Sequence, residues 1–359
     1  MVKFFDFVKT GFIFFFEFCI SVCDFISSRD LEFIQLNIMV LLSPLVSFFI
    51  IILYISIAKQ FKIVDVPNHR SSHSRVTIRG GGVIIPLIWF FWFVLNDYPL
   101  TYLTIALLIL SIFGFWDDIK NLDLPIRIAA QIISFLLIWY QLFGNSNWTL
   151  WVLPIAIITI GALNAVNFMD GINGITGLYA LAFFIPLQLK FTNHFFEPSP
   201  WILLIIAILS FGFFNFRKNA ICFLGDVGSL TIGLVFIFYI LALIYGFNPL
   251  KINEVSKGEF NISYLLLLSL YGIDVILTLF QRLFQGHKLS SPHRMHFYQI
   301  LVNENNVPHL LVSFLYAFFQ LLINIWVLWY TPTQFQSLLL ILFQCIIYII
   351  LKRNLTQNK

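Results

Sequence analysis

Charged residues are scarce in this sequence. Asp, Glu, Lys and Arg make up 11% of its 359 residues, whereas hydrophobic residues make up 60% and aromatic residues 18%. Soluble globular domains carry about 25% charged residues, so the composition excludes an ordinary soluble protein. We expect membrane lipid around the chain and no nucleic acid among its partners.

Cysteine is rare as well, and its spacing argues against a disulfide framework or a cysteine-based metal site. The four cysteines are scattered in or near apolar segments: Cys19, Cys23, Cys222 and Cys345. We interpret them as small buried hydrophobic residues. A cleavable signal peptide is not expected either, because Asp6, Glu17 and Asp24 interrupt the first apolar stretch.

Long apolar runs are what the sequence has in abundance. Such runs predict helices in a bilayer, because lipid offers no partner to open backbone groups. The predicted fold is therefore all-α, a polytopic membrane protein of about 10–11 transmembrane helices with cytoplasmic catalytic loops. The second and third of the eleven runs are short. The predicted spans are 36–58, 83–95, 101–116, 128–143, 149–163, 174–189, 201–215, 229–247, 263–281, 309–330 and 335–351.

The N-terminal residues 1–32 form a unit of their own in this interpretation. Polar residues recur there at helical spacing, which predicts an amphipathic helix at the membrane interface or packed on the bundle. The alternative is an extra transmembrane span, which would move the N-terminus to the cytoplasm. Residues 33–351 are expected to form a single integral-membrane domain, and residues 352–359 a cytoplasmic tail.

The basic residues are distributed unequally between the two faces of this topology. Fifteen of the 21 Lys and Arg residues fall on one face and six on the other, which assigns the first face to the cytoplasm. Six acids fall on that same face: Asp65, Asp117, Asp118, Asp123, Asp170 and Asp226. Carboxylates and cations gathered at one membrane face predict a polar, metal-dependent site that handles phosphate.

The first cytoplasmic loop ends in three consecutive glycines at positions 80–82. Such a run lets the backbone approach a ligand closely, and its amides can face an anion. The same loop supplies cationic donors suited to phosphate oxygens. These donors are Arg70, Arg75, Arg79, His69 and His73. The alternative is a basic anchor that touches only lipid headgroups.

The second loop begins with two adjacent carboxylates, Asp117 and Asp118. Neighbouring carboxylates repel each other unless a cation or a proton lies between them. A divalent metal, a phosphate held through it, or a general base would all fit this pair. Solvated charges at a helix end are the alternative.

The third loop carries Asn167, Asp170 and Asn173, whose spacing of three predicts one face of a helical turn. Amide and carboxylate groups together suit a nucleobase or sugar edge, or the waters of a metal ion. Helix capping and packing are the alternative.

The fourth loop places Asp226 and Ser229 at the start of an apolar helix. Ser229 is expected to cap this helix, whose exposed amides favour anions. Asp226 beside them is expected to bind magnesium, because a metal bridges carboxylate and phosphate. Capping alone is the alternative.

The fifth loop contains His293, Arg294 and His296, which are suited to gripping a diphosphate; a zinc site is less favoured, since no third soft ligand is near. Asp274 lies inside the ninth span, where an ionisable residue suggests function. The alternative for Asp274 is a structural pairing with Arg282, eight residues later.

In this order, the loops resemble the polyprenyl-phosphate N-acetylhexosamine-1-phosphate transferases of glycosyltransferase family 4. The most specific elements are Asn-x-x-Asn-x-x-Asp-Gly-Ile-Asn-Gly at 164–174 and Gly-Asp-x-Gly-Ser at 225–229. The stretch His-Arg-Met-His-Phe-Tyr-Gln at 293–299 is similar to the O-antigen and capsule branch rather than the triple-histidine muramoyl branch.

The resemblance implies a UDP-N-acetylhexosamine donor, an undecaprenyl phosphate acceptor, and Mg²⁺ with Mn²⁺ as a substitute. The product would be a lipid diphospho-sugar, with UMP released, as the first membrane step of O-antigen, capsule or related glycan synthesis. It also implies a bacterial cytoplasmic membrane with the active site facing the cytoplasm; homodimerisation is left open.

The resemblance also implies a role for each matching residue. Asp226 would bind the metal, Asp117 would deprotonate or position the acceptor phosphate, and Asp118 would support it or contact the metal. In the same mapping, Asn167, Asp170 and Asn173 would line the nucleotide pocket, and His296 with Arg294 and His293 would contact the diphosphate. Arg75 and Arg79 are expected from their own chemistry, as donors of the first loop, to bind substrate phosphate.

The sequence departs from the family pattern in two places. Many relatives have Asp where this chain has Asn173, and the first loop has Val76 and Ile78 in place of prolines. Two other functions remain as alternatives. One is the phospho-N-acetylmuramoyl-pentapeptide transferase of peptidoglycan synthesis; the other is a secondary transporter, for which only the intramembrane Asp274 speaks.

Overall fold

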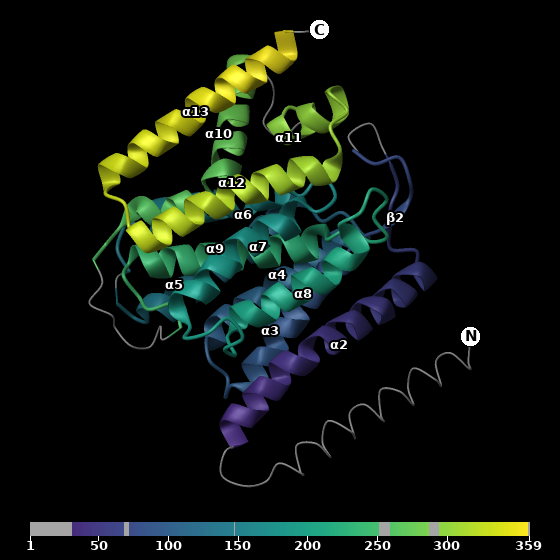
Figure 1. The fold of residues 1–359 in the computed structure, drawn as a ribbon, viewed down its shortest axis with the longest axis vertical. Coiled ribbons are helices and arrows are strands. Elements are labelled where there is room, and N and C mark those ends of the chain that lie inside the picture. Colours follow the sequence, from purple (N-terminus) through teal and green to yellow (C-terminus); the bar gives the residue numbers. More distant parts are fainter. Residues whose placement is uncertain (1–30, 68–71, 147, 251–258, 287–293, 358–359) are drawn as a thin grey trace.

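The computed structural model describes residues 31–67, 72–146, 148–250, 259–286 and 294–357 (Figure 1). Across these residues the chain is almost entirely helical, so the predicted all-α fold is confirmed. The sheet found there is a single antiparallel pair, β1 (Val64–Asp65) with β2 (Thr77–Ile78). The predicted N-terminal amphipathic helix and His293 lie outside the described residues.

Each of the eleven apolar runs falls on a helix. Eight of the described helices are long and apolar enough to cross a membrane, whereas α3, α7 and α8 are shorter. The protein is therefore a multi-pass membrane protein. The helices that carry the runs are α2 (Leu31–Gln60), α3 (Ile84–Leu95), α4 (Thr101–Ile119), α5 (Leu124–Phe143), α6 (Val152–Met169), α7 (Ile175–Phe191), α8 (Pro200–Asn215), α9 (Gly225–Ile244), α10 (Ser269–Phe284), α12 (His309–Tyr330) and α13 (Gln334–Gln357).

Two helix boundaries differ from the sequence prediction. The third span was expected to be short, but α4 continues to Ile119, because Asp117 and Asp118 are buried against other helices instead of being solvated. At the other end of the chain, α13 continues to Gln357 through the predicted tail, and the Lys352 side chain is buried.

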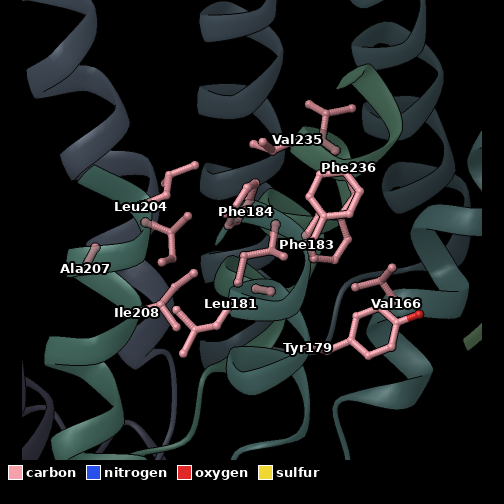
Figure 2. Packing of buried hydrophobic residues seen from close by; sticks show 14 of the residues in the cluster. Val166, Tyr179, Leu181, Phe183, Phe184, Leu204, Ala207, Ile208, Val235 and Phe236 are labelled. Atoms are coloured by element: carbon pink, nitrogen blue, oxygen red, sulfur yellow. The ribbon is translucent and has the colours of Figure 1, made fainter. Parts of the chain in front are cut away.

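Helix α9 is the centre of the bundle. Every residue from Val227 to Ile244 is buried, and the helix packs against α3, α4, α6 and α7. Figure 2 shows this core, in which Phe236 of α9 meets Phe183 and Phe184 of α7. A helix that is apolar on all sides must be enclosed by protein or lipid, and here protein encloses it.

Helix α13 shows the opposite arrangement. Only 6% of its membrane-spanning window is buried inside the protein. It extends along one side of the molecule and packs on α10 (Figure 1). Most of its apolar surface is thus left to lipid.

A buried polar side chain hydrogen-bonds the irregular backbone just before and at the start of α10. The 3-10 helix η2 (Ile262–Leu268) precedes α10, and Gln320 of α12 donates to the Leu266 carbonyl at 2.9 Å and accepts the Leu270 N–H at 3.1 Å. An unsatisfied backbone group in hydrocarbon costs several kcal/mol, roughly. Gln320 therefore stabilises an irregular backbone at membrane depth.

The successive helices run in alternating directions, and the five predicted loops meet at one end of the bundle. The Phe223 N–H donates to the Ile78 carbonyl at 2.7 Å, which joins the first loop to the fourth. The Tyr298 hydroxyl donates to the Phe168 carbonyl at 3.0 Å, which joins the fifth loop to the third. The fold thus gathers the polar motifs that the sequence separates.

Candidate active site

Asp118, at the C-terminal end of α4, caps the N-terminus of α9. Its Oδ1 accepts the Asp226 N–H at 2.9 Å and its Oδ2 accepts the Val227 N–H at 3.1 Å. The first turn of a helix has N–H groups with no partner in the helix, and a carboxylate is well suited to them. Asp118 thereby fixes the backbone that carries Asp226.

The prediction that Ser229 caps this helix is wrong. Helix α9 begins at Gly225, so Ser229 lies in its second turn. The Ser229 hydroxyl instead accepts a hydrogen bond from Asn167 Nδ2 at 3.0 Å. The cap comes from Asp118, more than a hundred residues away, which local sequence cannot indicate.

Arg79 bridges the two aspartates. Its Nε lies 2.6 Å from Asp118 Oδ1 and its Nη2 lies 2.9 Å from Asp226 Oδ1. Burial alone would lower the pKa of Arg79, but the charges of Asp226 and Asp118 raise it above its usual value. The guanidinium therefore stays charged, and it is part of the frame of the site.

The glycine run 80–82 packs against protein. The Gly81 and Gly82 N–H groups donate to the carbonyls of Phe223 and Leu224, both at 2.8 Å. A Cβ at Gly82 would lie 2.4 Å from the Gly228 Cα. The glycines thus permit close approach of the first loop to the start of α9, and the Gly81 and Gly82 amides are used by backbone carbonyls.

The carboxyl groups of Asp117 and Asp226 lie close together. They lie within hydrogen-bonding reach of each other, and a proton or a cation between them would offset the repulsion of two carboxylates. Asp117 is held by the Leu122 N–H at 2.6 Å and lies 3.6 Å from Arg127 Nη1. A divalent cation could be bound by both carboxylates of this pair.

The side chains of Asn167, Asp170 and Asn173 do not share one helical face. Helix α6 ends at Met169, and Gly174 has a positive φ of 83°, so the chain turns sharply between them. Asn167 remains near Asp226, within hydrogen-bonding reach of its carboxylate. The prediction of a single face is wrong because the helix stops before the second member of the motif.

Asn173 faces the loop after α8. Its Nδ2 donates to the Arg217 carbonyl at 2.9 Å and to the Lys218 carbonyl at 3.2 Å. Its own carbonyl accepts from the Ser313 hydroxyl at 2.8 Å. Asn173 is buried and ties three segments of the chain together, and a contact with the nucleotide stays a prediction.

Asp170 follows α6 and lies in a partly buried position beside the site. Burial raises its pKa to about 7, and the negative charge of Asp226 adds to this, while the positive charge of Arg79 opposes it. Asp170 therefore changes its charge near neutral pH.

His296 is buried against Asp274 of α10. Its Nδ1 lies 3.3 Å from Asp274 Oδ1. Asp274 also accepts from the hydroxyls of Tyr316 and Tyr348, at 2.7 and 3.1 Å. The predicted pairing of Asp274 with Arg282 is not found among these contacts.

The other expected cationic groups lie at different depths. Arg75 is exposed, and Arg294 is partly buried. Their expected contacts with substrate phosphate stay predictions.

Two residues of the site were not singled out from the sequence. The Tyr54 hydroxyl on α2 donates to the Arg79 carbonyl and so holds the backbone of the bridging arginine. Gly114 lies one turn before Asp117, and a Cβ there would be 2.9 Å from the Asp226 carbonyl oxygen. Neither residue stands out in the sequence, because Tyr and Gly are common in membrane helices.

The donor groups of this site suit the Mg²⁺ that the resemblance implies. Among the described residues, no group of three His, Cys, Asp or Glu side chains converges as in an all-protein metal site. Mg²⁺ is usually bound through one or two carboxylates together with substrate phosphates. Asp117 and Asp226, with the amide of Asn167 nearby, fit that pattern.

Part of the chain matches a known protein family. Residues 100–244 match the model of glycosyl transferase family 4. This part of the chain belongs to that family. The match runs from α4 to α9 and includes Asp117, Asp118, Asn167, Asp170 and Asp226. No curated protein matches the chain.

Family 4 membership gives the general activity. Its members are glycosyl-1-phosphate transferases that act on a polyprenyl phosphate in the membrane. Arg79, Asp274 and His296 lie outside the matched residues, and the fold brings Arg79 to the carboxylates of the matched part.

Proposed function

We propose that the protein transfers N-acetylhexosamine-1-phosphate from a UDP-sugar to undecaprenyl phosphate and releases UMP. The observation that carries this proposal is the pair of carboxyl groups of Asp117 and Asp226 at the loop end of the bundle, framed by Arg79 and Asp118. Two anionic substrates can meet only where their charge is offset. The membership in family 4 supports the same reaction class.

The reaction needs one phosphorus–oxygen bond to form and one to break. An oxygen of the acceptor phosphate attacks the phosphorus that carries the sugar, and the bond from that phosphorus to the bridging oxygen of the diphosphate breaks. UMP leaves with that oxygen. Catalysis of this kind depends on in-line positioning and on neutralising charge.

The residues divide this work between them. Asp117 positions the acceptor phosphate or removes its proton, and Asp226 with Asn167 holds the metal-binding side of the pocket. Asp118 and Arg79 keep Asp226 in place. Mg²⁺, when bound by Asp117 and Asp226, would offset the negative charge of the phosphates.

The proposed orientation places this end of the bundle in the cytoplasm of a bacterial cell. The excess of Lys and Arg on the loops of this face supports it. A UDP-sugar is a cytoplasmic donor, whereas the acceptor's hydrocarbon tail stays in the bilayer. A site at the membrane surface is accessible to both.

The transporter alternative loses its one supporting observation. Asp274 is fully buried and accepts hydrogen bonds from two tyrosine hydroxyls and a backbone N–H. A transported cation would have to bind these same oxygens, which already accept hydrogen bonds from the protein. The carboxylate pair also lies at helix ends, whereas transporter sites lie near the bilayer midplane.

The test uses purified full-length protein in detergent with Mg²⁺, undecaprenyl phosphate and a panel of UDP-N-acetylhexosamines that includes the muramoyl-pentapeptide donor. We expect UMP only when lipid phosphate and Mg²⁺ are both present. Asp226→Asn should abolish turnover, whereas Asp123→Asn, which changes an exposed acid on the same face, should not. A folded Asp226→Asn protein with wild-type turnover would overturn the metal assignment.

A further inference from the structure

Asp274 is a buried carboxylate that holds several segments at once. Its Oδ1 accepts the Phe297 N–H at 3.0 Å and the Tyr348 hydroxyl at 3.1 Å, and lies 3.3 Å from His296 Nδ1. Its Oδ2 accepts the Tyr316 hydroxyl at 2.7 Å. An unpaired carboxylate at this depth would be costly, and this set of donors satisfies both of its oxygens.

The ring of His296 is fixed on its other side as well. It stacks on Tyr298 with the ring centroids 5.9 Å apart and the planes at 18°. The Tyr298 hydroxyl donates to the Phe168 carbonyl at the end of α6, and a Cβ at Gly171 would lie 2.2 Å from that hydroxyl. Asp274 is thereby linked through His296 and Tyr298 to the helix that carries Asn167.

The two tautomers of His296 are not equivalent in this setting. With Nδ1 protonated, the ring donates to a carboxylate, which is a strong charge-assisted bond. The alternative is that the ring accepts the Gln299 N–H of the local capping box. That tautomer would point a nitrogen lone pair toward the negative charge of Asp274, so the carboxylate favours the first.

We propose that Asp274 is a positioning residue for the transfer reaction. It favours the tautomer of His296 in which Nδ1 carries the proton, and it fixes the ring. Any contact of His296 with a substrate phosphate is then made through Nε2. This inference rests on the proposed function of the site. It adds a residue outside the part of the chain that matches family 4.

The network offers a matched control for a merely structural role. Tyr316→Phe removes the donor to the other oxygen of the same carboxylate and leaves the contact with His296 intact. Both Tyr316→Phe and Asp274→Asn should lower the melting temperature. Only Asp274→Asn should lower kcat, by about 10²-fold or more, with KM changed little, because the lost contact acts in the transition state.

A double substitution separates positioning from packing. In a His296→Ala background, adding Asp274→Asn should change kcat by less than about 3-fold, because residues that act as a unit are not additive. If the two losses multiply, Asp274 acts independently of His296 and the proposal is overturned. Equal losses of kcat in Asp274→Asn and Tyr316→Phe would overturn it too.

A spectroscopic measurement makes the test independent of turnover. In full-length protein labelled with ¹⁵N-histidine, the His296 signal is assigned by its absence in His296→Gln. We expect a protonated Nδ1 in the wild type and loss of that preference in Asp274→Asn. An Nε2–H tautomer in the wild type would overturn the proposal. If no donor yields UMP, the proposed function fails, and this spectrum still decides the contact.

Discussion

The carboxylate of Asp118 accepts the backbone N–H of Asp226 at 2.9 Å and binds Arg79 Nε at 2.6 Å through the same oxygen. Its other oxygen takes the Val227 N–H at 3.1 Å, and none of the side chain is exposed. The last turn of α4 is therefore locked to the first turn of α9. The position of the Asp226 carboxylate depends on a residue from another helix.

Asp118→Asn should destabilise the protein and lower turnover. An asparagine has one acceptor oxygen, so its amide group would face either an N–H donor or the guanidinium. Leaving such groups unpaired costs about 1–3 kcal/mol each. The melting temperature in detergent measures the effect, with Asp123→Asn as the exposed control on the same loop. Equal melting temperatures for the two variants would contradict the capping role.

The same geometry predicts that Asp118 does not form a covalent phospho-enzyme. Both of its oxygens are engaged and its side chain is shielded from solvent. Incubation of the enzyme with a UDP-sugar labelled on its sugar-bearing phosphate, without acceptor, should leave Asp118 unmodified by mass spectrometry. An Asp118 peptide that carries the sugar phosphate would mean that the carboxylate leaves its cap during turnover.

Arg79→Lys should lower turnover by about tenfold or more, although the charge is kept. Arg79 uses Nε for Asp118 and Nη2 for Asp226, and a single ammonium group cannot reproduce this fork. Arg353→Lys is the control, because Arg353 is an exposed arginine on α13. The comparison is made on kcat/KM for UMP release. Wild-type kcat/KM in Arg79→Lys would mean that charge alone matters at this position.

The helices could be predicted from the sequence because each apolar run is long and lipid enforces a helix. The α4 boundary was missed, since a pair of aspartates usually ends a buried helix. Here Asp117 and Asp118 remain helical because Leu122, Arg127, Arg79 and the α9 amides satisfy them. Arg79 and the α9 amides come from distant parts of the chain, so no local pattern reveals these partners.

The site was recognisable from the sequence as a set of residue types, but not as a geometry. Asp117 and Asp226 were both named as candidates, and their contact depends on the packing of α4 against α9, which Gly114 permits. Asn173 carries the same motif spacing as Asn167 and yet faces away toward the Arg217 carbonyl. The turn at Gly174 decides this, and spacing alone cannot show it.

Asp170 should make stability depend on pH. An unfolded Asp titrates near pH ~3.9, whereas burial raises the pKa of Asp170 to about 7. Between these values the folded protein holds a proton that the unfolded chain has released. Its contribution to stability is therefore full below pH ~4 and is lost as the pH rises through about 7, with a slope of at most about 1.4 kcal/mol per pH unit.

The measurement is the melting temperature of the wild type and of Asp170→Asn over that pH range. The wild type should lose stability relative to the variant as the pH rises toward 7, and the difference should level off above it. The partial exposure of Asp170 to solvent reduces the size of the effect. Parallel curves for the two proteins would show that Asp170 is not protonated in the folded state.

Asn173→Asp should be harmful in this chain, although it would restore the residue of the family pattern that the sequence resembles. The Asn173 Nδ2 donates to the Arg217 and Lys218 carbonyls at 2.9 and 3.2 Å. A carboxylate there would place a negative oxygen against two carbonyl oxygens, and a buried charge without a donor is unfavourable. We expect a lower melting temperature and a reduced kcat/KM. Asn219→Asp, an exposed change of the same charge next to this loop, is the control. If Asn173→Asp matches that control in both measurements, the loop after α8 does not depend on the Asn173 amide.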